Sequence, residues 1–239
     1  MKILIYGGDG VSAFSLSETL KVFRAISKHV EVIDHHFLNK KEWEKETKLL
    51  VFPGGRDIPY DRNLKGKGTT KIRKFVEEGG SFLGICAGAY FGTSEVIFEK
   101  GTPLEIHEKR DLQFFPGAAI GTLYPYAIFS YDSEAGTHPS EISFKGKPLH
   151  LYYNGGCTFE KAQKYPGVTI LAHYLDANNQ PAIIHCRVGK GNVILSGVHF
   201  EISSAPLKEK GCMPITLEKL KKSDEKRKNL VSDILNYLL

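Results

Sequence analysis

The sequence lacks the cysteine and histidine patterns that mark disulfide scaffolds and metal sites. Its four cysteines form no C-x-x-C pair and no regular framework; they are Cys86, Cys157, Cys186 and Cys212. His35 and His36 are adjacent, and His185-Cys186 has no matching pair, so neither has the spacing of metal ligands. We therefore expect no metal and no cofactor, and unpaired thiols suit a reducing compartment.

Long hydrophobic runs are also missing. No stretch is long enough to span a membrane, and the first apolar run, Lys2–Tyr6, is too short for the core of a signal peptide. These absences predict a cytoplasmic protein with no membrane partner.

Most of the excess positive charge lies near the end of the chain. The net charge is +5, and much of the excess follows residue 207, at Lys208, Lys210, Lys219, Lys221, Lys222, Lys226, Arg227 and Lys228. Such a tail is usually the solvated face of a helix, and a nucleic-acid patch is the minor interpretation. We expect a helix over 217–239 that packs back on the domain, and no nucleic-acid partner.

What the chain does contain is a motif suited to a nucleophile. Residues 81–85 read as a buried strand that turns at Cys86 into a helix, and residues 84–88 have the G-x-nucleophile-x-G spacing of a nucleophile elbow. Small flanking residues leave room for the sharp turn. The helix N-terminus then favours the thiolate form of the cysteine. The alternative is a small buried cysteine at a tight turn.

The first half of the chain has the rhythm of a parallel sheet. Strands are predicted at 2–6, 30–34, 49–52 and 81–85, with helices at 15–28 and 70–78 between them; Ser15 to Glu18 has the pattern of a capping box. From about residue 95 short turns favour antiparallel hairpins, with strands at 112–115, 142–144, 149–153, 168–175 and 182–188, before a last buried strand at 191–197. The chain is therefore an α/β protein.

One loop in the first half offers a competing hypothesis. Residues 8–13 match G-x-G-x-x-A, and Asp34 ends the next strand, as a dinucleotide-binding fingerprint would require. The alternative is that a strand-to-helix turn beside a site is simply glycine-rich, and no second mononucleotide-binding half follows.

Two further loops supply partners for Cys86. Gly54 and Gly55 follow a strand, so their N–H groups, with that of Ala87, are candidate oxyanion donors. Arg56 and Asp57 follow as substrate contacts or as solvated turn residues. Late in the chain His199 and Glu201 follow another strand, and could supply the base and the group that orients it. Aromatic runs such as the one ending at Asn154 could wall the pocket, although such runs are more often core.

Together these motifs resemble class I glutamine amidotransferase-like domains, and more narrowly the N-terminal domain of biotin-protein ligases. The resemblance covers residues 1–204 and rests on residues 52–60, 84–90, 114–117, 153–156 and 197–199. It implies a flavodoxin-like three-layer sandwich with a mostly parallel central sheet and antiparallel strands in the second half. Residues 205–239, beyond the resemblance, are expected to form the Lys-rich helical extension packed on the same domain. The resemblance also implies a catalytic Cys86, His199 and Glu201.

Departures from that pattern shape the functional hypotheses. Tyr90 stands where glutamine-using members usually carry Gln, and the late loop is shortened, so substrate contacts have changed. No G-R-G-R-x-x-R loop of a biotin-ligase catalytic domain is present, so we expect no complete ligase. The leading hypothesis is cysteine attack on an amide or acyl C–N bond of a small molecule. The alternatives are a non-catalytic ligand-binding or regulatory module associated with biotin-protein ligase, whose catalytic chain would be a partner, and a dinucleotide-binding domain.

Overall fold

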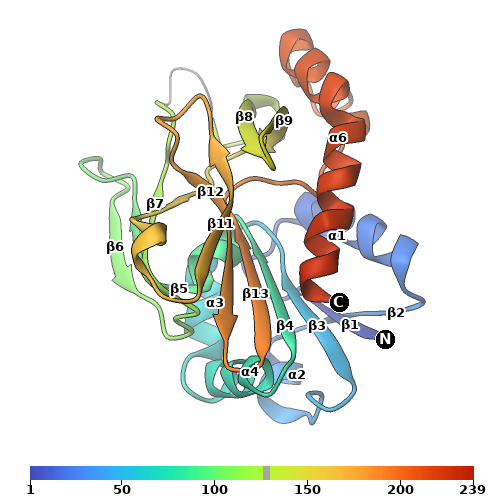
Figure 1. The fold of residues 1–239 in the computed structure, drawn as a ribbon, viewed down its shortest axis with the longest axis vertical. Coiled ribbons are helices and arrows are strands. Elements are labelled where there is room, and N and C mark those ends of the chain that lie inside the picture. The colour runs from blue at the N-terminus through green and yellow to red at the C-terminus, as the bar shows by residue number, and fades with distance from the viewer. Residues whose placement is uncertain (126–129) are drawn as a thin grey trace.

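The structure is a computed structural model that describes residues 1–125 and 130–239. Within these residues the main sheet has nine strands in the order β2-β1-β3-β4-β13-β12-β11-β8-β9 (Figure 1). The five parallel strands are β1 (Lys2–Tyr6), β2 (His29–Ile33), β3 (Thr47–Phe52), β4 (Ser81–Ile85) and β13 (Gly191–Ser196). The antiparallel part comprises β12 (Pro181–Val188), β11 (Val168–Tyr174), β8 (His138–Phe144) and β9 (Lys147–Tyr153). The α/β class and the change from parallel to antiparallel pairing are as predicted.

Helices cover both faces of the sheet because side chains alternate along its strands. On β3, Leu50 and Phe52 pack in one core and Leu49 and Val51 in the other. The first core contacts the helices on one face, which are α2 (His35–Lys40), α3 (Asp57–Leu64), α4 (Lys67–Glu77) and α5 (Ala87–Phe91). The second contacts α1 (Ala13–Ile26) and α6 (Pro214–Leu238). This makes three layers.

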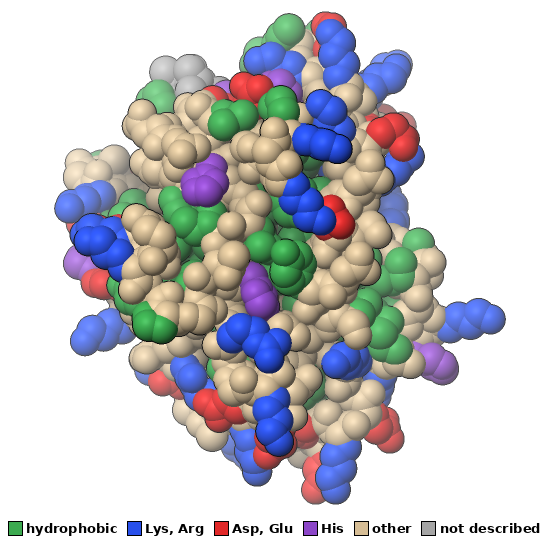
Figure 2. All heavy atoms as spheres, in the orientation of Figure 1, with side chains coloured by type: hydrophobic (Ala, Val, Ile, Leu, Met, Phe, Trp, Pro, Cys, Tyr) green, Lys and Arg blue, Asp and Glu red, His purple; other side chains and the backbone are tan. Residues whose placement is uncertain are grey.

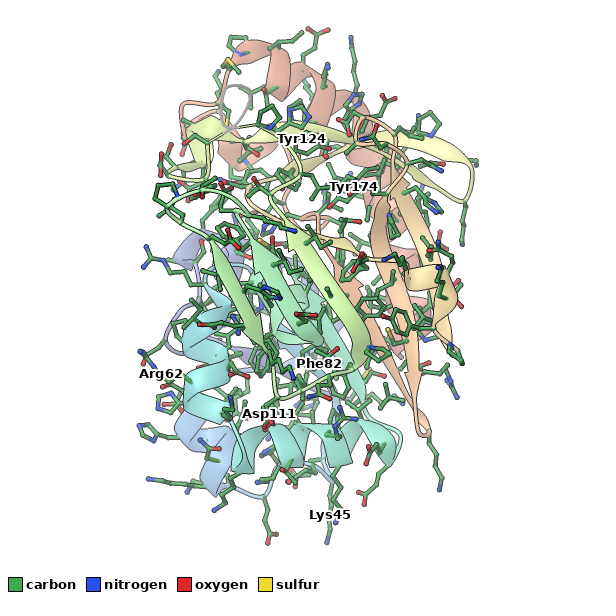
Figure 3. The ribbon with its side chains drawn as sticks, turned by 90° about the vertical axis from the view of Figure 1, so that its left-hand side faces the viewer. Lys45, Arg62, Phe82, Asp111, Tyr124 and Tyr174 are labelled. Atoms are coloured by element: carbon green, nitrogen blue, oxygen red, sulfur yellow. The ribbon has the colours of Figure 1, made fainter. Side chains whose placement is uncertain are left out.

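A second sheet, which the sequence did not suggest, lies beside the first. Its order is β10-β7-β5-β6, from β5 (Thr93–Phe98), β6 (Ile106–Lys109), β7 (Phe115–Gly121) and β10 (Thr158–Phe159). Figure 3 shows it, in green, in front of the larger sheet, with Asp111 between it and α4. Asp111 accepts hydrogen bonds from Thr69 and from the N–H of Gly66, which tie the sheet to the helices.

Two predicted features need correction, and helix α3 was not predicted. The strand expected at 112–115 is wrong, because Gln113 has a left-handed φ of 52° that interrupts extended backbone; the strand begins at Phe115. The sequence suggests a turn after the strand at residues 56 and 57, but α3 begins at Asp57; Pro59 fits in its first turn, where a missing N–H breaks no helical bond. The capping box at Ser15 is also wrong, since Ser12 caps α1 and accepts from the Ser15 N–H at 3.3 Å.

The C-terminal helix packs on the domain as expected. Leu230, Ile234 and Leu238 of α6 are buried in the second core.

On the face shown in Figure 2, Lys and Arg side chains are spread over the upper and lower parts of the surface with acidic side chains between them. In the part of the chain that the structure describes, no helix has the length and apolar character needed to cross a membrane.

Candidate active site

The topology brings three loops to one edge of the main sheet. Strands β3, β4 and β13 are parallel neighbours, so their carboxyl ends lie side by side. Gly54 follows β3, Cys86 follows β4 and His199 follows β13. Ligands of open α/β sheets bind at this edge of the strands. Residues more than a hundred positions apart in the chain therefore meet in one place.

Cys86 has the strained backbone of a nucleophile elbow. Its φ is 51° and its ψ is −105°, a conformation that non-glycine residues rarely adopt. A Cβ on Gly88 would lie 2.0 Å from the Phe52 carbonyl oxygen, so only glycine lets α5 approach β3 this closely. The Cys86 N–H donates to the Ser196 carbonyl at 2.8 Å and ties the turn to β13. Cys86 is 5% exposed at the start of α5.

His199 is held by a buried carboxylate. Its Nδ1 lies 2.7 Å from Oε1 of Glu201, and both residues are at most 4% exposed. The His199 N–H donates to the Tyr152 carbonyl at 2.9 Å, and the Tyr152 ring stands edge-on to the imidazole at 5.2 Å. The carboxylate accepts from Nδ1–H and so fixes the ring orientation, which places the Cε1 edge of the imidazole against the Gly54 backbone.

The electrostatics favour a charged imidazole. Burial alone would lower the pKa of His199, but the Glu201 carboxylate and polar interactions with Cys86 raise it to about 10. No aligned hydrogen bond joins the Cys86 sulfur to the ring among the described residues, and such bonds often align only when substrate binds. An imidazolium beside a thiol is the environment that activates cysteine nucleophiles.

The two N–H groups of the glycine loop after β3 differ in whether the protein itself provides a hydrogen-bond acceptor. The Gly54 N–H donates to Oγ of Ser15 at 2.9 Å, so it is not available as the oxyanion donor that the sequence suggested. Gly55 is exposed, with φ 144°, and a Cβ there would lie 2.0 Å from the Gly10 carbonyl oxygen. Among the loop hydrogen bonds of the described chain, none uses the Gly55 or Ala87 N–H. These two groups remain as candidate donors.

Two other residues predicted to line the site, Tyr90 and Asn154, form hydrogen bonds in the loop beside Cys86. Tyr90 is buried and its hydroxyl donates to the carbonyls of Gly155 and Gly156, at 3.2 and 3.0 Å. Asn154 places its carbonyl oxygen 3.8 Å from the Cys86 sulfur, and its Nδ2 donates to the Tyr152 hydroxyl at 3.0 Å. Tyr90 and Asn154 therefore shape the loop beside the nucleophile.

Arg56 and Asp57 differ in their surroundings. Arg56 is exposed, and its N–H donates to the Gly10 carbonyl at 2.7 Å. Asp57 accepts from Nε of Arg110 at 2.7 Å, and that guanidinium is 1% exposed. Burial raises the pKa of Asp57, while the charge of Arg110 acts in the opposite direction. Asp57 thus anchors the second sheet through Arg110, a partner that no local sequence pattern indicates.

The glycine-rich loop at residues 8–13 serves this site through packing. The Gly10 carbonyl accepts from Arg56, and Val11 forms a β-bridge with Gly55. Asp34, the other part of the dinucleotide fingerprint, accepts from the Phe37 N–H at 2.8 Å and caps α2. Both features therefore have structural roles that favour packing over nucleotide binding.

Burial disfavours ionisation of the three remaining cysteines. Burial raises the pKa of Cys157 well above its usual value, raises that of Cys186 to about 12, and also raises that of Cys212. All four thiols are free. Over residues 1–125 and 130–239 no group of three or more His, Cys, Asp or Glu side chains is placed to hold a metal ion.

Comparisons with known proteins agree with this architecture. The family model described as "Biotin-protein ligase, N terminal" matches residues 1–239. The biotin–protein ligase of Schizosaccharomyces pombe is 39% identical over 253 residues, which cover 100% of this chain and 38% of that protein. An uncharacterized protein of Chlamydia muridarum is 43% identical over 209 residues, covering 84% of this chain and 80% of that one.

Among solved structures, a glutamine amidotransferase from Thermotoga maritima superimposes with a TM-score of 0.58 over 100% of this chain and 97% of that chain, at 15% identity. At this identity the likeness establishes the fold alone, which is that of class I glutamine amidotransferase-like domains. The chain spans little more than a third of the length of the fungal ligase. On the whole-length family match and the two close relatives, the chain belongs to the biotin-protein ligase N-terminal domain family.

Proposed function

We propose that the protein cleaves or transfers the acyl group of a small-molecule amide, or of a related acyl C–N compound, with Cys86 as nucleophile. The single observation that supports this most strongly is the convergence of a strained Cys86, a His199 held at 2.7 Å by buried Glu201, and two glycine-flanked loops at the ends of adjacent strands. A strained backbone and the removal of two charged groups from water both cost free energy, and such costs are typical of functional sites.

The chemistry runs in two steps. The Cys86 sulfur bonds to the acyl carbon, the oxyanion is stabilised by the N–H groups of Gly55 and Ala87, and the C–N bond breaks as the His199 imidazolium gives its proton to the departing nitrogen. Water, or another acceptor, then attacks the thioester. His199 takes a proton from the attacking group, which regenerates the imidazolium, and Cys86 leaves as the thiolate while the acyl product is released.

Glutamine itself is a weak candidate for the substrate. Tyr90 stands at the position where glutamine-using relatives of this fold usually carry Gln, and its hydroxyl is already committed to the carbonyls of Gly155 and Gly156. A polar group that is satisfied within the protein has less to offer a substrate amide. We therefore expect an acyl compound other than glutamine.

The test is to trap the acyl-enzyme. The protein is incubated with a panel of primary amides, including glutamine, and with thioesters and activated esters, then quenched in acid and weighed by intact-protein mass spectrometry. We expect an acyl adduct on Cys86 from at least one class and none from Cys86→Ala. Wild-type protein that forms no adduct, and releases no ammonia from any amide, would refute the proposal.

A non-catalytic binding role is the second candidate, and one observation favours it. Cys86 is only 5% exposed and Tyr90 seals the adjacent glycine turn, so the site is nearly closed. In that case Cys86→Ala would leave the biological role intact.

The free thiols also suit a reducing compartment such as the cytoplasm. Since the fungal relative continues well beyond the matched part, we add that a biotin-ligase catalytic chain is a candidate partner.

A further inference from the structure

A buried serine, Ser15, forms hydrogen bonds both to Glu201 and to the glycine loop after β3. Ser15 stands in the first turn of α1 and is 2% exposed. Its Oγ donates to Oε1 of Glu201 at 3.1 Å and accepts the N–H of Gly54 at 2.9 Å. The hydroxyl thus lies between the carboxylate that orients the imidazole and the loop that carries the oxyanion donors. No other part of the proposed mechanism uses it.

The direction of these hydrogen bonds is fixed by chemistry. An ionised carboxylate can only accept and a peptide N–H can only donate, so the single hydroxyl proton must point at Glu201. Oε1 of Glu201 then receives two donors, His199 Nδ1 and Ser15 Oγ, whereas Oε2 is buried without a partner in the described chain. The position of the carboxylate therefore depends on Ser15 as well as on the histidine.

The Gly54 side of the link matters for a steric reason. A Cβ on Gly54 would lie 2.4 Å from Cε1 of His199 and 3.2 Å from its Nε2, so the Gly54 backbone is packed directly against the ring. By holding the Gly54 N–H, Ser15 sets the distance between that backbone and the imidazole. It also orients the following peptide, whose N–H belongs to Gly55.

We propose that Ser15 is a positioning residue, one that fixes Glu201 and the Gly54 loop relative to each other and so sets the geometry of the Cys86–His199 pair. This inference rests on the proposed function of the same site. The charge-assisted hydrogen bond to Glu201 is the stronger of the two links, so loss of the hydroxyl should act mainly through the carboxylate.

The experiment is a double-mutant cycle read by the rate at which iodoacetamide alkylates Cys86, measured by peptide mass spectrometry. Ser15→Ala should lower the rate about tenfold, the loss expected of one hydrogen bond to a charged group. Ser15→Thr, which keeps the hydroxyl, should restore most of it. Ser17→Ala, at an exposed position of the same helix, should leave the rate unchanged.

The cycle separates positioning from general loosening of the fold. In a Glu201→Gln background, Ser15→Ala should change the rate less than about twofold, because the group through which it acts is altered. Where wild-type Cys86 reacts faster than free cysteine, equal losses in both backgrounds, or no loss from Ser15→Ala in the wild-type background, would overturn the inference.

Failure of the proposed function has a different signature. If wild-type Cys86 reacts no faster than free cysteine and no acyl adduct forms, unfolding in urea is compared for wild type, Ser15→Ala, Glu201→Gln and the variant that carries both substitutions. Non-additive changes in the free energy of unfolding would still support a Ser15–Glu201 positioning link, and additive changes would overturn it.

Discussion

Adding a single methyl group at Gly54 should uncouple the imidazole from the thiol without unfolding the protein. The Gly54 backbone has no left-handed φ, so alanine is allowed there, but its Cβ would lie 2.4 Å from Cε1 of His199. Ordinary contacts begin near 3.4 Å, so the ring must move by about 1 Å. The Glu201 hydrogen bond at 2.7 Å resists that movement.

The size of the effect follows from this displacement. A misplacement of about 1 Å in a catalytic group costs on the order of 10²-fold in rate, while overpacking costs roughly 1–3 kcal/mol of stability. We therefore expect Gly54→Ala to remain folded at room temperature and to lose most of the enhanced reactivity of Cys86. The assay is the second-order rate of iodoacetamide alkylation at neutral pH, with urea unfolding run in parallel.

A matched control lies at the end of the neighbouring strand. A Cβ on Gly7 would lie 2.5 Å from Cγ1 of Val32, a side chain that is 42% exposed and can shift into solvent. Gly7→Ala should cost some stability and leave the alkylation rate near that of wild type. A folded Gly54→Ala protein that reacts at the wild-type rate, or equal losses in both variants, would contradict the geometry proposed for the site.

Three further predictions follow from contacts around the site. Arg227 of α6 donates at 2.9 Å to the Phe200 carbonyl, which lies between His199 and Glu201 in the chain. Arg227→Ala should therefore cost roughly 1.5–3 kcal/mol of stability and slow alkylation of Cys86. Lys228→Ala, at the surface, should stay within about 0.5 kcal/mol of the stability of wild type. The pKa of His199 is raised from 6.5 to about 10, so its stabilising pair with Glu201 is complete below pH 6.5 and lost as the pH rises through 10. Glu201→Gln should therefore lower the free energy of unfolding in urea by roughly 3–5 kcal/mol at pH 6, and by less as the pH rises over that window. A loss that stays constant with pH would argue against the pair. Burial raises the pKa of Cys157, so peptide mapping after native alkylation at pH 7 should find it unmodified and modified only in denaturant; rapid native labelling there would mean that the core opens.

Local spacing was enough to identify the residues that meet at the strand ends. The elbow around Cys86 and the glycines after β3 are short-range patterns whose geometry depends on a few neighbouring residues. Parallel strands followed from the alternation of strands and helices, so placing Cys86 and Gly54 on one edge required no distant information. His199 could be added because it too follows a buried strand.

Long-range contacts were beyond local patterns. Ser15 carries the signature of a capping box, yet its partner Glu201 lies 186 positions away and only the fold brings the two together. The buried guanidinium of Arg110, which neutralises Asp57, sits after an exposed strand with no pattern of its own. The second sheet was missed for another reason: β5, β6 and β7 lie close together in the chain, but their sequences have weak strand patterns, and β10 alone is added from far along the chain.

The central claim is that Cys86, His199 and Glu201 act as one chemical unit, and the most direct measurement is the alkylation rate of Cys86 at pH 7 in wild type and in His199→Ala. The account predicts that wild-type Cys86 reacts with iodoacetamide faster than free cysteine, and that removing the imidazole returns the rate to that of free cysteine or below. A wild-type rate no greater than that of free cysteine, or one unchanged by loss of the imidazole, would contradict it.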